Sequence, residues 1–211
     1  MKQTLAVVLF LLSTLSVTTV YGQREEENEK GDRDRTTKQL ELLLAETGPG
    51  INVEFKQSQK QRYNYVGSLK TGLVNAQSFE IIISVTEKDT IGFRVYPHYK
   101  DAYINAGKVG QPLQLMQLLL RLSDRAFLFW GIDESLDVFT GYTFTLESGF
   151  PEEAIKIVLR SIVNSDKFIG EMRPFLDAPI PDVTETTPVT SETKPKAPTT
   201  APRRRSTRRL P

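Results

Sequence analysis

Apolar and polar residues alternate most regularly in two runs, 78–86 and 90–97, that are separated by charged residues. The alternating apolar residues are Phe79, Ile81, Ile83 and Val85 in the first run and Ile91, Phe93 and Val95 in the second. Successive side chains of a strand point to opposite faces, so this spacing buries one face and exposes the other. The pattern predicts an antiparallel hairpin with one buried face.

Other stretches have weaker strand patterns. Residues 63–69, 126–132 and 138–146 each contain several β-branched or aromatic residues, and the last two stretches flank an acidic turn. We expect the last two to form a second hairpin. Residues 51–55 are a candidate for a short edge strand.

Helical spacing of apolar residues predicts three helices. The first covers 36–48 and has a leucine stripe, and Thr36 and Gln39 have the spacing of a capping box. The second begins at Pro112 and carries leucines almost all the way round, so it is either deeply buried or covered on a second side by another chain.

The third helix begins after Ser148-Gly149 and runs to residue 176, with a kink expected at 164–166. Pro151 suits its first turn, where Glu152 and Glu153 meet the positive end of the helix dipole. The predicted order is therefore helix, three strands, helix, two strands, helix. This order indicates an α+β fold in which helices pack on an antiparallel sheet.

The first 22 residues have the pattern of a secretory signal peptide. Lys2 precedes an apolar run over 5–20, and small residues stand at Val20 and Gly22, which predicts cleavage after Gly22. An uncleaved membrane anchor is the alternative, but the run is shorter than the roughly 20 apolar residues that a spanning helix needs. We therefore expect a secreted or periplasmic protein, with the choice between the two left open.

Composition divides the rest of the chain into three parts. Residues 23–35 are charged and contain no apolar residue, which is typical of a disordered spacer. Residues 36–177 have the periodicity of one globular domain, and 178–211 form a tail rich in proline and threonine. Because the chain has no cysteine, its domain must be stabilised by an ordinary apolar core.

The inventory of reactive side chains argues against catalysis. The absence of cysteine and the presence of a single histidine, His98, exclude thiol catalysis and a Cys/His zinc site. The glycines at 48–50 belong to no phosphate-binding motif, so we expect no nucleotide cofactor. We predict that the protein is not an enzyme and has no catalytic residue and no cofactor.

Two groups of carboxylates were considered as reactive sites. Asp133, Glu134 and Asp137 could converge on a hard cation, but they lack the pattern of a calcium loop, so a solvated hairpin tip is favoured and we predict no metal site. The dipole of the last helix already explains Glu152 and Glu153. A hydrolase that uses the carboxylates of the acidic turn is a further, less favoured hypothesis.

Several segments together resemble the YbjN family, which is similar in fold to type III secretion chaperones. The resemblance covers about 36–176 and rests on the strand pair ending in FRVYP, the hairpin FLFWGIDESLDVFTGYTFTL and the closing LESGFPEEAIKIVLRSIV. It implies a compact sandwich of helices and strands, often dimeric, that binds protein segments and has no known enzymatic chemistry. The chain departs from the family in its export signal and its basic tail, because the familiar members act in the cytoplasm.

These observations predict an exported, non-enzymatic binding module, chaperone-like or adaptor-like, that binds a protein partner and could form a homodimer. The residues predicted to contact the partner are Tyr96, Tyr99, Tyr103, Leu115 and Leu119. The alternative is an envelope-attached structural protein that the tail holds to an anionic surface. The residues predicted to contact that surface are Arg203, Arg204, Arg205, Arg208 and Arg209.

Overall fold

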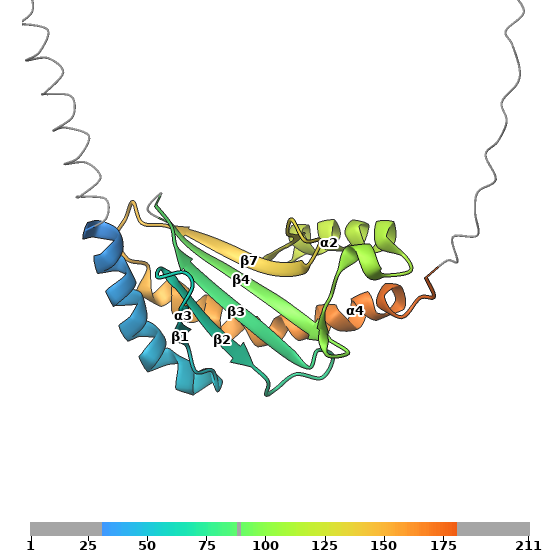
Figure 1. Ribbon diagram of the computed structural model, residues 1–211, viewed down its shortest axis with the longest axis horizontal. Helices are drawn as coiled ribbons and strands as arrows, with labels where there is room; N and C mark the ends of the chain where they lie inside the picture. The colour runs from blue at the N-terminus through green and yellow to red at the C-terminus, as the bar shows by residue number, and fades with distance from the viewer. Residues whose placement is uncertain (1–30, 88–89, 181–211) are drawn as a thin grey trace, which may run out of the picture. The chain divides into compact units, whose positions relative to one another are not determined.

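The computed structural model describes residues 31–87 and 90–180. The expected export signal, residues 23–30 of the expected spacer and the arginines of the tail lie outside these ranges. The described residues form a mixed α+β fold in which helices pack on an antiparallel sheet, so the predicted fold class is confirmed at this level (Figure 1). None of the described helices is long and apolar enough to cross a membrane.

The sheet has seven strands in the order β1-β2-β3-β4-β7-β6, with β5 paired to the end of β4. The strands are β1 (Lys56–Gln57), β2 (Asn64–Leu69), β3 (Ser78–Val85), β4 (Thr90–Tyr99), β5 (Ala102–Tyr103), β6 (Phe129–Ile132) and β7 (Val138–Thr145). Every neighbouring pair is antiparallel. The long strand β4 therefore lies in the middle of the sheet, between β3 and β7.

Helices account for most of the remaining described residues. They are the helix over 31–47, α2 (Pro112–Arg125), α3 (Glu152–Ser161) and α4 (Asp166–Leu176), with short 3-10 turns η1 (Gly48–Ile51), η2 (Ala106–Lys108) and η3 (Ile162–Ser165). Figure 1 shows α3 and α4 behind the sheet and α2 near β7. The expected third helix is thus divided into α3 and α4, which η3 joins at the position of the expected kink.

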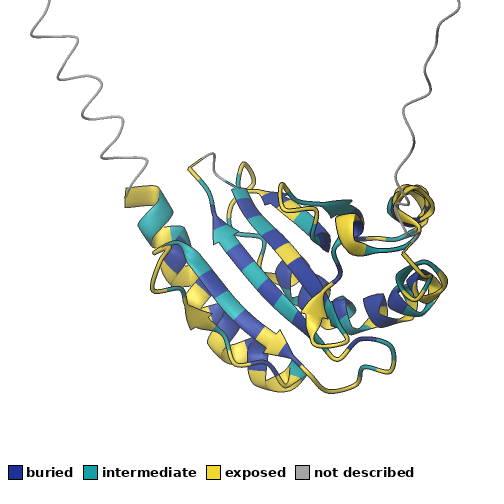
Figure 2. Ribbon diagram, turned by 45° about the vertical axis from the view of Figure 1, so that its right-hand side comes forward, coloured by how far each residue is buried: buried dark blue, intermediate teal, exposed yellow. Residues whose placement is uncertain are grey.

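One face of the sheet is covered by helices, and no helix within 31–87 and 90–180 covers the other. On β3, every second residue from Phe79 to Val85 is buried, and the residues between them are half-buried; Figure 2 shows this alternation. The buried face packs against leucines and isoleucines of the helices, which include Leu40, Leu44, Leu115, Leu122, Ile155 and Ile169. Burying each such side chain stabilises the fold by about 1.5–3 kcal/mol.

Several boundaries differ from the predicted ones, and the strand expected over 126–132 begins only at Phe129. Residues 31–35 are helical, although they were expected to belong to the disordered spacer. The expected edge strand at 51–55 does not form, because pairing with β2 begins only at Lys56. At the other end, Ala178 and Pro179 pack so closely on Gly110 that a side chain at that glycine would collide with their carbonyl groups, so the described fold extends beyond 177.

Tertiary contacts explain why the first helix starts early. The Arg33 guanidinium lies 3.6 Å from the centre of the Tyr63 ring, and its Nε donates a hydrogen bond of 2.9 Å to the Val85 carbonyl. Arg62 also pairs with Asp34 at 3.0 Å. These charged residues have no apolar periodicity, so their place on the helix follows from partners far away in the sequence.

A buried carboxylate connects the loop before β3 to the start of α4. Asp166 is 6% exposed and accepts hydrogen bonds from the backbone N–H groups of Val74, Asn75 and Ala76, and from the Asn75 side-chain amide, at 2.8–3.1 Å. Hydrogen bonds to a charged acceptor are among the stronger ones in proteins. This contact fixes the end of the sheet to the helix layer.

At the outer edge of the sheet, Ser123 of α2 contacts the backbone of Trp130 on β6. The Ser123 hydroxyl accepts a hydrogen bond of 2.7 Å from the Trp130 N–H and lies 2.9 Å from the Trp130 carbonyl. An edge strand with free backbone groups invites pairing with another chain. Ser123 occupies the Trp130 N–H within the fold, so this group is not available for pairing with another strand.

Candidate binding surface

The face of the sheet that no described helix covers is called the open face here. It carries the alternate residues of each strand that point away from the core, and pairing across the strands arranges them in rows. The middle row contains Val66, Ile82, Arg94, Gly141 and Phe129. The row on one side of it contains Glu80, Tyr96 and Phe139, and the row on the other side contains Asn64, Ser84, Gly92 and Thr143.

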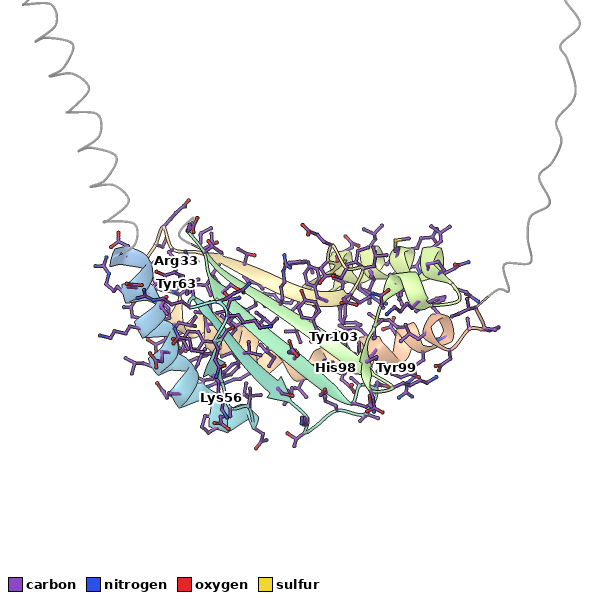
Figure 3. The ribbon with its side chains drawn as sticks, viewed as in Figure 1. Arg33, Lys56, Tyr63, His98, Tyr99 and Tyr103 are labelled. Carbon is purple, nitrogen blue, oxygen red and sulfur yellow. The ribbon has the colours of Figure 1, made fainter. Side chains whose placement is uncertain are left out.

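Five rings form an aromatic cluster at one end of the open face. Its members are Tyr96, His98, Tyr103, Phe129 and Phe139. Ring centres lie 4.4 Å apart for His98 and Tyr103 and 5.8 Å apart for Tyr103 and Tyr96, for Tyr96 and Phe139, and for Phe139 and Phe129. The cluster therefore runs continuously from β5 across β4 and β7 to β6, and Figure 3 shows His98 and Tyr103 near one end of β4.

Exposure within the aromatic cluster is uneven. Tyr96 and Phe139 are buried, whereas Tyr103 is 39% and Phe129 42% exposed. The inner rings support the outer ones, so the two exposed rings are held in fixed positions and lose little conformational entropy when another molecule covers them. Rings of this type are favourable contacts in protein interfaces.

Tyr103 is held in place by a tight turn and by an acidic neighbour. The turn between β4 and β5 has positive φ at Lys100 and Asp101, at +51° and +61°, and the Asp101 side chain accepts a 2.8 Å hydrogen bond from Gln77. The Tyr103 hydroxyl donates a 2.9 Å hydrogen bond to Glu80. Burial and this hydrogen bond raise the pKa of Tyr103 to about 12.

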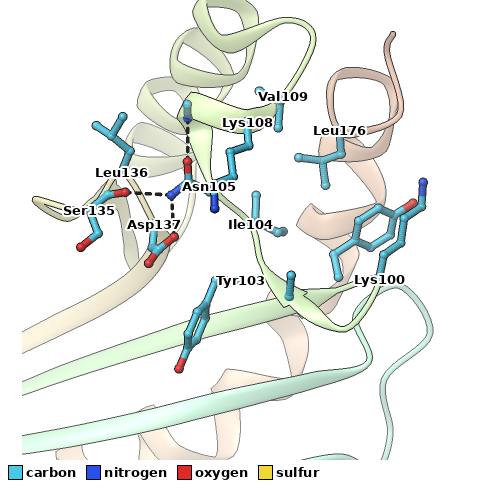
Figure 4. A pocket seen from close by; sticks show the side chains of 13 residues that line it. Lys100, Tyr103, Ile104, Asn105, Lys108, Val109, Ser135, Leu136, Asp137 and Leu176 are labelled. Atoms are coloured by element: carbon cyan, nitrogen blue, oxygen red, sulfur yellow. Dashed lines mark hydrogen bonds between the residues drawn. The ribbon is translucent and has the colours of Figure 1, made fainter. Parts of the chain in front are cut away.

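A cleft of about 790 Å³ lies beside Tyr103, between the 99–109 segment, the acidic turn and the end of α4 (Figure 4). One wall is fixed by Asn105, whose side-chain amide donates hydrogen bonds of 2.8 Å to the Ser135 carbonyl and to Asp137. The Asn105 side-chain oxygen accepts a 3.0 Å bond from the Gly107 N–H. Tyr103 lines this cleft and also belongs to the aromatic cluster, so the two form one continuous surface.

The acidic turn has a structural explanation. Asp133 accepts hydrogen bonds from the backbone N–H groups of Ser135 and Asp137 and from the Tyr96 hydroxyl, while Asp137 is bound by Asn105. Two of the three carboxylates that are candidates for cation ligands therefore accept hydrogen bonds that stabilise the turn. Within 31–87 and 90–180, no group of three or more histidine, cysteine or acidic residues is placed to hold a metal ion.

Tyr99, which was predicted to contact the partner together with Tyr96 and Tyr103, lies on the other side of β4. Its hydroxyl donates a 2.9 Å hydrogen bond to Asp177, which also pairs with Lys100 at 2.6 Å. The hydrogen bonds from Lys100 and Tyr99 lower the pKa of Asp177. Tyr99 therefore attaches the end of α4 to the sheet and lies outside the aromatic cluster.

The predicted contact residues of α2 are also placed differently. Leu115 and Leu119 are 0% and 3% exposed and belong to the core of the fold, so they are not available to a partner. The exposed apolar residues of α2 are Leu113, Met116 and Leu120. Leucines nearly all round a helix predict two apolar sides, but the sequence alone does not identify which side meets the sheet.

Phe129, Phe139 and Arg94 belong to the open face, although sequence reasoning missed them. The alternation of 90–97 already places Arg94 opposite the apolar residues, so its side is predictable. The meeting of Phe129 and Phe139 with Tyr96 depends on the pairing of β7 with β4, which are separated in sequence by β5, α2 and β6. No local pattern indicates that pairing.

Comparison of the chain with protein-family models, with curated proteins and with solved structures gives no match in any of the three.

Proposed function

We propose that this protein is a non-enzymatic binding module, exported from the cytoplasm, that binds a segment of another protein on its open face. The observation that carries this proposal is the aromatic cluster, which presents two partly exposed rings on a sheet face that no described helix covers. An antiparallel sheet can leave one face in water, but that face is then usually polar. Supported, partly exposed rings are typical of binding surfaces.

The proposal includes the predicted chaperone-like or adaptor-like character. Support for it is the resemblance of 36–176 to the YbjN family, which rests on the order of the elements and on the acidic hairpin followed by a final helix that begins near a proline. The pattern of an export signal over 1–22 supports a location in the periplasm or outside the cell. Its function would therefore be to hold a protein segment outside the cytoplasm.

A photo-crosslinking experiment tests the binding surface. A benzophenone amino acid replaces Phe129 in one variant, and in a matched control it replaces Phe127, which is 60% exposed and lies outside the aromatic cluster. Irradiation in the cell envelope should give one protein adduct at position 129 and much less of it at position 127. Equal labelling at both positions, or none at either, would contradict the proposal.

A homodimer is the second partner that we propose, through the apolar residues Leu113, Met116 and Leu120. They are spaced three and four residues apart, so they lie along one side of α2, and they are 58%, 37% and 72% exposed. Sedimentation should show two chains, and Leu120→Glu should give one. A wild-type monomer at high protein concentration would exclude this dimer without affecting the open face.

The alternative function is attachment of the protein to an anionic surface by the tail. Residues 181–211 contain seven basic and three acidic residues, and five of the basic ones are arginines within 203–209. Attraction of this kind weakens as salt is added. Removal of 181–211, which keeps the residues that pack on Gly110, should release the protein from the envelope fraction if the tail holds it there.

A further inference from the structure

Three glycines interrupt the strands of the open face, and two of them are covered by rings. A side chain at Gly141 would meet the Phe129 ring at 3.0 Å, and one at Gly131 would meet the Phe139 ring at 3.3 Å. At Gly141 the Phe93 carbonyl oxygen, 2.5 Å from the added atom, also excludes a side chain. At Gly131 the Phe139 ring would have to shift by a few tenths of an ångström. Gly92 on the central strand β4 differs, because a Cβ atom added there meets no atom of the described residues within 4 Å.

The fold itself gives no reason for a glycine at position 92. Its φ is not in the left-handed region, and no side chain of residues 31–87 or 90–180 occupies the space above it. Glycine weakens the interior of a strand and often marks a place where another backbone or a ligand approaches closely. The bare position is therefore an indication that something outside the described residues approaches the sheet here.

The residues paired with Gly92 on the neighbouring strands also have small side chains, so together they form a shallow row across the sheet. Gly92 is paired with Ser84 on one side and with Thr143 on the other, and Ser84 is paired with Asn64. We call these four residues the small-residue row. None of them is larger than asparagine, so a chain that crosses the sheet at this row could come close to its backbone.

Arg94 borders the small-residue row and supplies a charge. It lies two residues from Gly92 on the same face and is exposed, and its guanidinium lies 4.8 Å from the centre of the Phe139 ring. Among the described residues, Arg94 forms no ion pair. Its neutral partners are Tyr96, to whose hydroxyl it donates a hydrogen bond, and the Phe139 ring. Lys56 pairs with Glu54, and Glu80 accepts a hydrogen bond from Tyr103.

We propose that the segment bound on the open face is an extended, acidic peptide whose backbone crosses the small-residue row at Gly92 and whose carboxylate pairs with Arg94. This inference rests on the proposed function and adds the place and the chemistry of the bound segment. Guanidinium and carboxylate groups match in shape and charge, and a glycine that lacks a covering ring leaves room for a main chain. The exposed ring of Phe129, in the same row as Arg94, would contact an apolar residue of the segment.

Peptide selection on charge-swapped proteins tests the inference. A library of random peptides is selected in parallel on the full chain and on its Arg94→Glu variant, so that attraction to the tail is equal in both. Wild-type protein should enrich Asp and Glu, and the Arg94→Glu variant should enrich Lys and Arg. An Arg121→Glu variant, which changes the same charge on α2, should enrich the same peptides as wild type.

A second measurement uses the selected peptides. Replacing the enriched Glu by Gln should weaken binding about fivefold, as expected for a partly exposed ion pair. Gly92→Val should weaken binding at least about tenfold while the unfolding temperature of the free protein stays the same or rises. The control is Thr145→Val, which places a valine on the same face but outside the small-residue row. It should bind the selected peptides with the affinity of the wild type.

The outcomes separate the inference from the proposed function. If no peptide is enriched on wild type above the unselected library, both are wrong. If peptides are enriched but the two pools are identical, or if Gly92→Val binds as well as wild type, the protein binds peptides elsewhere and the inference alone is overturned. A wild-type dimer that Gly92→Val converts to a monomer would assign the small-residue row to a second copy and would also overturn it.

Discussion

The two faces of one sheet differ in what their side chains do. On the covered face, Phe79, Ile81, Phe93 and Val95 are each no more than 1% exposed and belong to a single core with the helices. On the open face, rings gather at one end and small residues at the other. Arg94, which forms no ion pair among the described residues, lies between them. The covered face therefore accounts for stability, and the open face is where we expect function.

Adjacent isoleucines of β3 give the sharpest test of this difference. Ile81 is fully buried on the covered face, whereas Ile82 is half-buried on the open face. We expect Ile81→Ala to lower the free energy of unfolding by about 2–5 kcal/mol, and Ile82→Ala by about 1 kcal/mol. Urea denaturation measures both, and equal losses would mean that the open face is also packed in solution.

The second effect concerns the connection of the sheet to the helix layer. Asp166→Ala removes the acceptor of the three backbone N–H groups at 74–76. We expect a loss of about 2–3 kcal/mol in the free energy of unfolding, together with faster amide exchange at these residues. Asp124→Ala, an exposed change on α2, is the control and should stay within about 0.5 kcal/mol of wild type.

Alanine substitutions at two glycines of the open face should change the free energy of unfolding in opposite directions. Gly141→Ala places a methyl group against the Phe129 ring and the backbone of Phe93, so it should lower the free energy of unfolding by about 1–3 kcal/mol. Gly92→Ala meets nothing and should raise it by about 0.5 kcal/mol. Chemical denaturation measures both free energies of unfolding. A large decrease for Gly92→Ala would show that the fold itself requires a glycine at this position.

The smallest expected change in stability comes from the titration of Tyr103 at alkaline pH. Burial and Glu80 raise the pKa of Tyr103 to about 12, above its ordinary value of 10.0. A raised pKa in the folded state stabilises the protein fully below the unfolded value, and this contribution is lost as pH rises from about 10 to about 12. Stability should therefore fall more steeply over this range in wild type than in Tyr103→Phe. Parallel curves from thermal unfolding would contradict this.

Much of the fold could be predicted because its signals are local. The alternation of 78–86 and 90–97 gives β3 and β4 within two residues, and Pro112 marks the first residue of α2. The early start of the first helix could not be predicted, since charged residues carry no periodicity and Arg33 depends on Tyr63 and Val85. Leu115 and Leu119 were assigned to a partner because a helix with two apolar sides does not show which one faces inward.

The candidate site was predictable only in part. The loop that carries Tyr96 and Tyr103 was identified from its rings, which lie close together in the sequence. Phe129 and Phe139 were missed, because they reach Tyr96 only through the antiparallel pairing of β7 with β4. Tyr99 was grouped with the others, although its odd position on β4 places it on the covered side.

By itself the sequence determined the α+β class, the faces of the central hairpin and the scarcity of reactive side chains, because each depends on residue type and short-range spacing. The tertiary structure decided which leucines are core, why Asp133 and Asp166 are where they are, and which rings meet. It also decided that Gly131 and Gly141 are covered and Gly92 is bare. The physical reason is that strand pairing and helix packing bring together residues that are distant in the chain, and no local pattern encodes those contacts.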